Sequence, residues 1–143
     1  MKGMDKNIAA RKAAAEMHLV EAREAAARAD LELVEHAVTA VHPEAGRLHL
    51  YVNPYNSEYF TSQLTDADGT LLTEEVGDIV VFHEDGGHDA DGEPISVPVT
   101  VSDLMDKAMR TCPSDVRDQL LQPENEDSEC SGRYYLPLPL VTE

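Results

Sequence analysis

Residues 5–41 of this chain read DKNIAARKAAAEMHLVEAREAAARADLELVEHAVTAV. The stretch contains neither Gly nor Pro, and its commonest residue is Ala, which has the highest helix propensity. His42 and Pro43 follow at once, and the residue before a proline is pushed out of the α region. The sequence therefore predicts one long helix over residues 5–41, around which the rest of the chain is organised.

Steps of three and four residues along this helix select an apolar seam that runs its whole length. The seam is mostly Ala in its first half and Leu or Val from Leu31 onward. We therefore expect the second half to pack on the protein's own domain and the first half to project. The ten seam positions, nine of them apolar, are Ala10, Ala13, Met17, Val20, Glu24, Ala27, Leu31, Val34, Val38 and Val41.

The length of the helix also predicts a projecting half. At about 1.5 Å per residue the helix spans roughly 55 Å, whereas a domain of about 100 residues is about 35 Å across. Basic side chains in the first half oppose the helix dipole, and an acidic partner would offset that cost. The residues of this half that we expect to contact a protein partner are Lys6, Arg11, Lys12 and Met17.

Two other uses of the seam remain open. The whole helix can pack inside one small α+β fold, or two copies can pair as a parallel coiled coil. The coiled coil is disfavoured because its flanking interchain pairs would be like-charged. Those pairs are Glu16 with Glu21, Arg23 with Arg28, and Asp30 with Glu35.

Length and composition predict a single domain with an arm. The chain has 143 residues, which we divide into a helical arm over 1–42 and an acidic α+β domain with an extended C-terminal tail over 43–143. No stretch approaches the roughly 18 apolar residues of a membrane span, and the N-terminus lacks a secretory apolar core. We expect a cytoplasmic protein, or one carried in a virion. Cys112 and Cys130 are too few for a disulfide framework, and whether they pair stays open.

The negative charge is concentrated after residue 42. The net charge of the chain is −17; residues 1–42 contribute −1 and residues 43–143 contribute −16. Such a field repels nucleic acid and anionic membrane and favours protein partners with basic surfaces. An acidic proteome, such as that of a halophile, or a simple solubility device is the alternative explanation.

The pattern of residues 43–143 predicts an antiparallel sheet or small barrel of four to six strands, with two short helices near the C-terminus. We expect residues 79–83 to be buried on both faces because they are continuously apolar. We expect the side chains of residues 95, 97, 99 and 101 to point inward, and residues 84–93 to form an exposed acidic loop. The expected strands are 47–53, 59–64, 70–73, 79–83 and 95–101, and the expected helices are 102–110, capped by Ser102, and 114–121.

The C-terminal residues RYYLPLPLVTE form a tail with two unlike faces. Leu136, Leu138 and Leu140 share one face, and Pro137 and Pro139 share the other. Because proline removes backbone donors, the tail can be only an edge strand or a polyproline-like segment. We expect the three leucines to dock on the protein's own sheet or in a neighbour's groove, and we count them as partner-binding residues.

No motif points to catalysis. Asp-x-Asp-Gly occurs at residues 66–69 and 89–92, but a calcium loop would place Leu64 or Gly87 at its first ligand position, so both copies are interpreted as turns. The acidic residues and histidines of 83–91 are dense, yet their Gly-Gly loop would not hold them rigidly around a metal. The chain has no nucleophile elbow, phosphate loop or dinucleotide fingerprint. We predict no catalytic residue, metal ligand, cofactor or small-molecule substrate; a metal-dependent enzyme is a distant alternative.

Two binding functions remain. In the first, the protein is a non-enzymatic structural protein, of a virus for example, that self-associates or docks onto a larger assembly through its arm and Leu-Pro tail. In the second, the acidic domain imitates nucleic acid and inhibits a DNA- or RNA-binding protein. A mimic should align its acids in one stripe with little exposed apolar surface, whereas an assembly protein should have apolar patches on the arm and tail.

Overall fold

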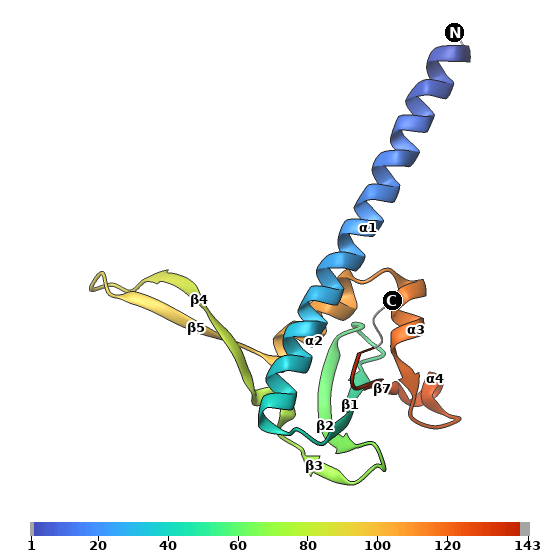
Figure 1. Cartoon of the computed structure of the whole chain (residues 1–143). Coiled ribbons are helices and arrows are strands. Elements are labelled where there is room, and N and C mark those ends of the chain that lie inside the picture. Colours follow the sequence, from blue (N-terminus) through green and yellow to red (C-terminus); the bar gives the residue numbers. More distant parts are fainter. Residues whose placement is uncertain (1, 141–143) are drawn as a thin grey trace.

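The computed structural model describes residues 2–140, and the side chains of all of these except 2–5, 129 and 130. It is an α+β fold in which a long N-terminal helix, α1 (Lys2–Val41), runs across and beyond an open antiparallel sheet (Figure 1). The remaining elements are β1 (Ala45–Val52), β2 (Tyr59–Asp66), β3 (Leu71–Thr73), the 3-10 helix η1 (Val76–Asp78), β4 (Val80–His88), β5 (Pro94–Thr100), α2 (Val101–Thr111), α3 (Ser114–Leu120), β6 (Gln122–Pro123), α4 (Ser128–Ser131) and β7 (Arg133–Pro137).

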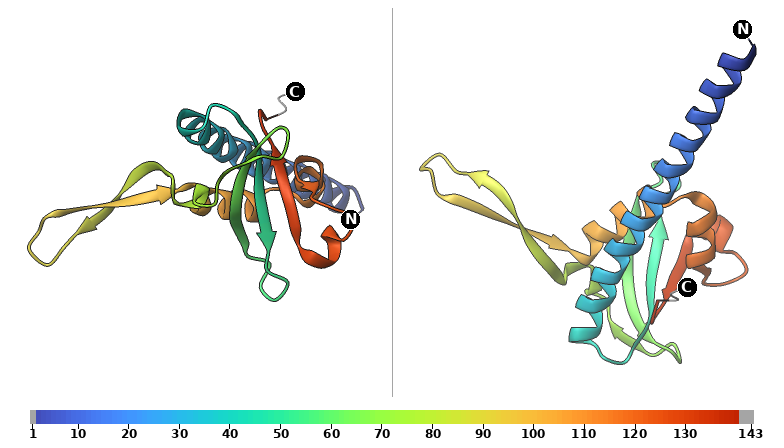
Figure 2. Two further views of the ribbon diagram at one scale, coloured as in Figure 1. Left: turned by 90° about the horizontal axis from the view of Figure 1, so that it is seen from below. Right: turned by 45° about the horizontal axis from the view of Figure 1, so that its top comes forward.

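Five strands form the main sheet in the order β3-β2-β1-β7-β6, while β4 and β5 pair only with each other. Helix α2 and the C-terminal half of α1 pack against each other over one face of the sheet (Figure 2). This layer of two helices on a sheet encloses an aliphatic core. Its fully buried large side chains include Leu31, Val34, Val38, Leu48, Leu50, Leu64, Met105, Met109 and Leu136.

Helix α1 divides where its seam predicts. Ala27, Leu31, Val34 and Val38 are each at most 1% exposed, because they face α2 and the sheet. By contrast, every residue from 6 to 23 is exposed. The helix begins at Lys2 rather than at residue 5, so the projecting part is slightly longer than the sequence predicts.

Helix α2 is capped by Thr100 rather than by Ser102. The Thr100 hydroxyl accepts a hydrogen bond from the Asp103 backbone N–H at 3.3 Å, and Asp103 Oδ2 accepts one from the Thr100 N–H at 3.0 Å. This is a capping box, which needs an acceptor residue three positions after the cap. Both candidates have hydroxyl side chains, but Thr100 lies three positions before an aspartate, whereas Ser102 lies three before Met105.

The predicted burial of residues 79–83 on both faces is wrong, and of the four side chains expected to point inward from 95–101 only Val99 and Val101 are buried. Instead of entering the main sheet, β4 and β5 form a two-stranded hairpin that leaves the body (Figures 1 and 2). Val80, Phe82, Ile95 and Val97 are exposed because no element covers this hairpin beyond its base. Residues 84–88 also belong to β4, so the expected loop shortens to a turn over residues 89–93.

The two Asp-Ala-Asp-Gly segments form the same turn, as the sequence predicts. Asp66 Oδ1 accepts hydrogen bonds from the N–H groups of Asp68 and Thr70, both at 2.9 Å. Asp89 Oδ1 likewise accepts hydrogen bonds from the N–H groups of Asp91 and Glu93, at 2.9 and 3.0 Å. The glycine of each segment has a positive φ, +89° at Gly69 and +80° at Gly92. The first turn joins β2 to β3, and the second closes the β4–β5 hairpin.

The C-terminal tail lies inside the main sheet. Strand β7 pairs antiparallel with β1 along its whole length, from Arg47 with Pro137 to Tyr51 with Arg133. On its other side the two-residue β6 pairs only with Tyr134 and Tyr135. Beyond these two residues β7 has a strand neighbour on one side only, where a proline is tolerated.

The division of α1 is testable with two leucines of the same helix. Leu31→Ala should lower the free energy of unfolding by about 2–5 kcal/mol, because it opens a cavity in the core. Leu19→Ala should change it by about 0.5 kcal/mol or less, because Leu19 is exposed on the projecting half. Urea denaturation followed by circular dichroism at low protein concentration measures both. Equal losses in the two variants would show that the projecting half is packed.

Candidate contact surfaces

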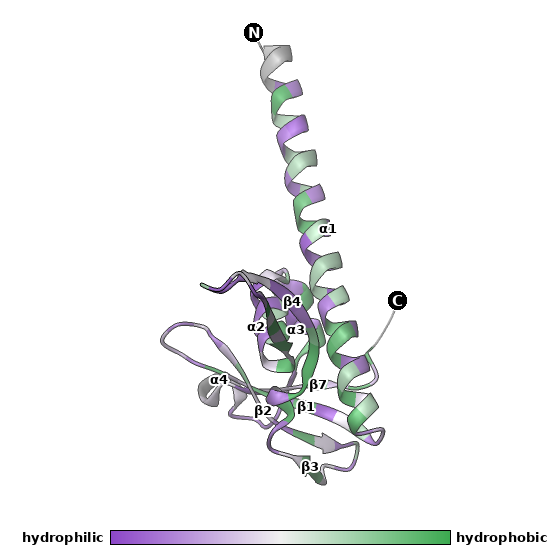
Figure 3. Cartoon of the chain, turned by 90° about the vertical axis from the view of Figure 1, so that its left-hand side faces the viewer, coloured by the Kyte–Doolittle hydropathy of each residue, from purple (hydrophilic) through white to green (hydrophobic). Residues whose placement is uncertain are grey.

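The projecting part of α1, which we name the arm (residues 6–23), has exposed apolar side chains along its length. At 1.5 Å per residue it extends about 27 Å. Its exposed large apolar residues are Ile8, Met17, Leu19 and Val20, and Met17 is the most open at 64%. Figure 3 shows apolar and hydrophilic residues alternating along the arm, whereas α1 becomes more continuously apolar where it meets the body.

The apolar residues of the arm lie on two stripes. Met17 and Val20 continue the seam that packs on the body further along α1, but here they are exposed and no described element covers them. Ile8 and Leu19 lie on a second stripe with Ala15 and Ala22, at the 3, 4 and 7-residue spacings that keep side chains on one helix face. At about 100° per residue the stripes are roughly 160° apart, so the arm can be covered from more than one side.

The basic residues predicted to bind a partner are on this arm and are exposed. Lys6, Arg11 and Lys12 point in different directions around the helix, so they form a positive sleeve rather than a basic face. Lys12 Nζ lies 3.8 Å from Glu16 Oε1, an exposed pair on adjacent turns that contributes little to stability. The arm holds four basic and two acidic residues, a net charge of +2 on a chain of net charge −17.

A second projection was not predicted: the β4–β5 hairpin, which we name the hairpin (residues 80–100). Phe82, Ile95 and Val97 lie on one of its faces. Glu84 pairs with Val97, and Phe82 with Val99, which sets these residues on a common face. A Cβ on Gly86 would lie 2.5 Å from Val97 Cγ2 and 3.1 Å from Ile95 Cγ2, so these side chains close over the glycine.

The hairpin is strongly acidic toward its tip. It contains five acidic residues and no Lys or Arg: Glu84, Asp85, Asp89, Asp91 and Glu93. Its hydrophilic tip and more apolar base are visible in Figure 3. One signal in the sequence points to it: the second Asp-Ala-Asp-Gly repeats the turn of the β2–β3 hairpin, so a hairpin was also to be expected around residues 89–92.

The tail leucines predicted to bind a partner are packed into the protein itself. Leu136 is 1% exposed and Leu138 is 8% exposed, and Leu140 packs against the same core. The Leu140 backbone N–H also donates to Glu35 Oε1 of α1 at 3.3 Å. A partner would reach these side chains only by displacing the tail, so in this structure they are not a free contact surface.

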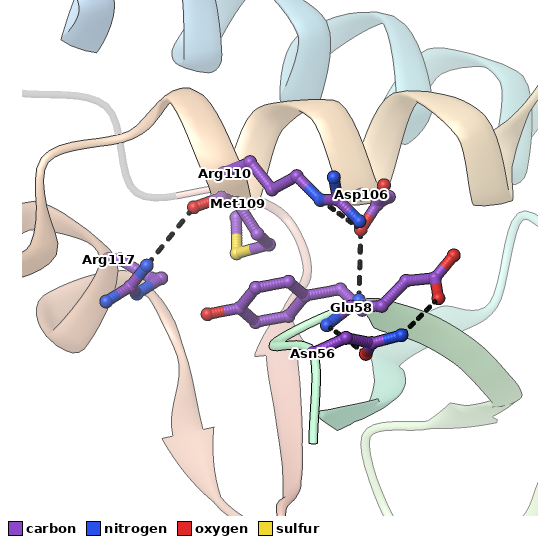
Figure 4. Close-up of polar contacts among 7 residues, drawn as sticks. Asn56, Glu58, Asp106, Met109, Arg110 and Arg117 are labelled. Atoms are coloured by element: carbon purple, nitrogen blue, oxygen red, sulfur yellow. Dashed lines mark hydrogen bonds and ion pairs between the residues drawn. The ribbon is translucent and has the colours of Figure 1, made fainter. Parts of the chain in front are cut away.

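A pocket of about 520 Å³ opens between β1, β2 and α3. Beside it, Asp106 Oδ1 of α2 accepts hydrogen bonds from the Tyr59 backbone N–H at 3.0 Å and from Arg110 Nε at 3.1 Å (Figure 4). Arg117 of α3 donates to the Met109 carbonyl oxygen at 3.3 Å, and its guanidinium carbon lies 5.9 Å from the centroid of the Tyr59 ring. These contacts tie α2, α3 and β2 together. The pocket is lined by Tyr51, Val52, Pro54, Tyr59, Arg117, Asp118, Leu121, Pro123, Ser131, Gly132 and Tyr134.

Two titratable groups at or near this pocket have shifted pKa values. Burial raises the pKa of the Tyr59 hydroxyl, an effect that the positive charge of Arg117 opposes. Burial also raises the pKa of the nearby Cys112 thiol, and a buried, protonated thiol is a poor nucleophile. The described side chains that line the pocket include no His or Cys. The sequence left open whether Cys112 and Cys130 pair, and the side chain of Cys130 lies outside those that the structure describes.

One buried polar group was missed by the sequence pattern. His49 alternates with Leu48 and Leu50 along β1, so it lies on the opposite face of that strand, where it is only 6% exposed. Its Nε2 lies 2.9 Å from Thr65 Oγ1, and its Nδ1 lies 3.4 Å from Glu124 Oε2. Both ring nitrogens therefore have partners inside the chain, which leaves none directed at a ligand.

Comparison of the chain with protein-family models, curated proteins and solved structures found no match. Within residues 2–140, no helix is long and apolar enough to cross a membrane. No group of three or more His, Cys, Asp or Glu side chains is placed to hold a metal ion in the part of the chain that the structure describes.

The packing of the tail is testable by charge insertion. Leu138→Asp should destabilise the fold by on the order of 3 kcal/mol, because it places a carboxylate in the core. The melting temperature should fall equally at every protein concentration, because the contact is within one chain. Leu71→Asp, at a half-exposed leucine of β3, is the control and should have a small effect. An unchanged melting temperature combined with loss of an assembly would instead place Leu138 against a neighbour.

Proposed function

We propose that the protein is a non-enzymatic structural component that self-associates, or joins a larger assembly, through its arm. The observation that carries this proposal is the exposure of residues 6–23 of α1, a rigid helix of about 27 Å with four large apolar side chains and no intramolecular cover. The described part of the domain makes no packing contact that would bury the arm. Its exposed apolar stripes would be stabilised by contact with another chain.

The distribution of apolar surface supports assembly over nucleic-acid mimicry. A mimic needs carboxylates arranged at phosphate-like intervals with little apolar surface between them. Here large apolar side chains are exposed on both projections. Such groups favour protein–protein contact, because burying each removes apolar area from water.

The second candidate function remains an acidic inhibitor of a DNA- or RNA-binding protein. The net charge of −16 over residues 43–143 favours it, since such a field attracts basic grooves. The two functions differ in the part of the chain that they need. An inhibitor would act through the acidic body and keep its activity without the arm, whereas an assembly component would not. We propose the cytoplasm, or a virion, as the place where the assembly forms.

Deletion of residues 1–20 tests the proposal. The shortened chain should fold, because the core residues Ala27, Leu31, Val34 and Val38 remain. The number of chains per particle should fall relative to the full chain, because the arm that joins the copies is lost. Size-exclusion chromatography with light scattering measures the masses, and circular dichroism checks the fold. A full-length chain that is monomeric, and stays so up to millimolar concentration, would contradict self-association.

A further inference from the structure

We propose that the arm of one chain docks on the apolar face of the hairpin of a second copy. This inference rests on the proposed function and names the surface that receives the arm. The structure exposes both surfaces of this contact: a helix with apolar stripes, and a two-stranded hairpin whose Phe82, Ile95 and Val97 share an uncovered face.

The apolar face of the hairpin would be stabilised by another element packed on it. An isolated two-stranded hairpin is marginally stable in water, and a hydrophobic face becomes stable only when a third strand or a helix packs on it. Among the described elements, the main contacts of this hairpin with the body are made by its base with α1 and α2. The arm supplies a helix, and its length of about 27 Å matches the roughly 24 Å of the seven residues from Phe82 to His88.

The charges of the two projections are complementary. The arm has a net charge of +2, and the hairpin carries five carboxylates with no Lys or Arg. Two arms would bring like charges together, and so would two hairpins. An arm placed on a hairpin brings a positive helix against an acidic projection, and Glu84 is the carboxylate that lies on the docking face, opposite Val97. The charges therefore favour this pairing over the other two.

A chain cannot make this contact with itself. The arm and the hairpin leave the body in diverging directions in every view (Figures 1 and 2). The contact must therefore join two chains, and it uses different surfaces on each. Such a heterologous contact leaves one free arm and one free hairpin on every dimer, so it builds a ring or an open chain of copies.

Full-length variants that each disable one projection test this pairing. The arm variant is Met17→Gln/Leu19→Gln/Val20→Gln, which keeps strong helix formers on the arm. The hairpin variant is Phe82→Thr/Ile95→Thr/Val97→Thr, which keeps residues of high β-propensity. The matched controls are Ala14→Gln, between the two arm stripes, and His83→Thr, on the opposite face of the hairpin. Light scattering gives the masses, and circular dichroism confirms that each variant is folded.

Each variant alone should remain a monomer at concentrations where the wild type and both controls associate. An equimolar mixture should form a 1:1 complex of twice the monomer mass that grows no further, because only one intact arm and one intact hairpin remain. Lys6→Glu/Arg11→Glu on the hairpin variant, whose arm is intact, should weaken this complex at least tenfold. Glu84→Lys on the arm variant, whose hairpin is intact, should restore it.

The outcomes separate this inference from the function on which it rests. If the hairpin variant associates as strongly as the wild type while the arm variant does not, the arm is an assembly element but the hairpin is not its receptor, and the inference is overturned. If the two monomeric variants do not combine on mixing, a heterologous arm–hairpin contact is likewise overturned. If the arm variant keeps the wild-type mass, the proposed function itself fails.

Discussion

One face of α1 packs against α2 and the sheet, and the arrangement of the whole molecule depends on this contact. The buried residues of this face are Ala27, Leu31, Val34 and Val38. The sheet cannot cover more of the helix than it does. A strand of eight residues such as β1 extends about 27 Å, whereas the 40 residues of α1 extend about 60 Å. About half of the helix must leave the body. Because the larger seam residues come last, it is the N-terminal half that projects.

The sequence predicts the elements of this fold better than their surroundings. The long helix, its apolar seam and both Asp-Ala-Asp-Gly turns follow from spacing and local hydrogen bonding, which the sequence records directly. The burial of residues 79–83 was predicted wrongly because an apolar run shows which side chains avoid water but not whether a neighbour covers them. The prediction of the contact surfaces has the same limit, because it also depends on which elements lie next to one another. The arm was predicted from its length and charge, whereas the apolar face of the hairpin depends on β4 and β5 pairing away from the sheet, and the packing of Leu136 and Leu138 depends on β7 entering it.

The acidity of the body constrains how copies can meet. Two bodies, each with a charge of −16 over residues 43–143, repel each other at close range. At about 0.1 M salt the Debye length is about 10 Å, so charges separated by more than two such lengths interact weakly. Contacts made by projections of about 25 Å hold the bodies apart by a comparable distance. Association through projections therefore avoids the repulsion that association through the acidic surface would meet.

Energy explains why each projection carries several apolar residues rather than one. Burying one large apolar side chain contributes roughly 1.5–3 kcal/mol, whereas joining two chains costs an estimated 4–15 kcal/mol of lost translational and rotational freedom. One residue such as Met17 cannot offset that cost, whereas the two large apolar residues of one arm stripe together with the three on the hairpin can. Charge complementarity then adds orientation more than affinity, because exposed ion pairs at the rim of a contact contribute little. In the proposed assembly the apolar residues would decide whether copies associate, and the basic residues Lys6, Arg11 and Lys12 would decide which surface the arm meets.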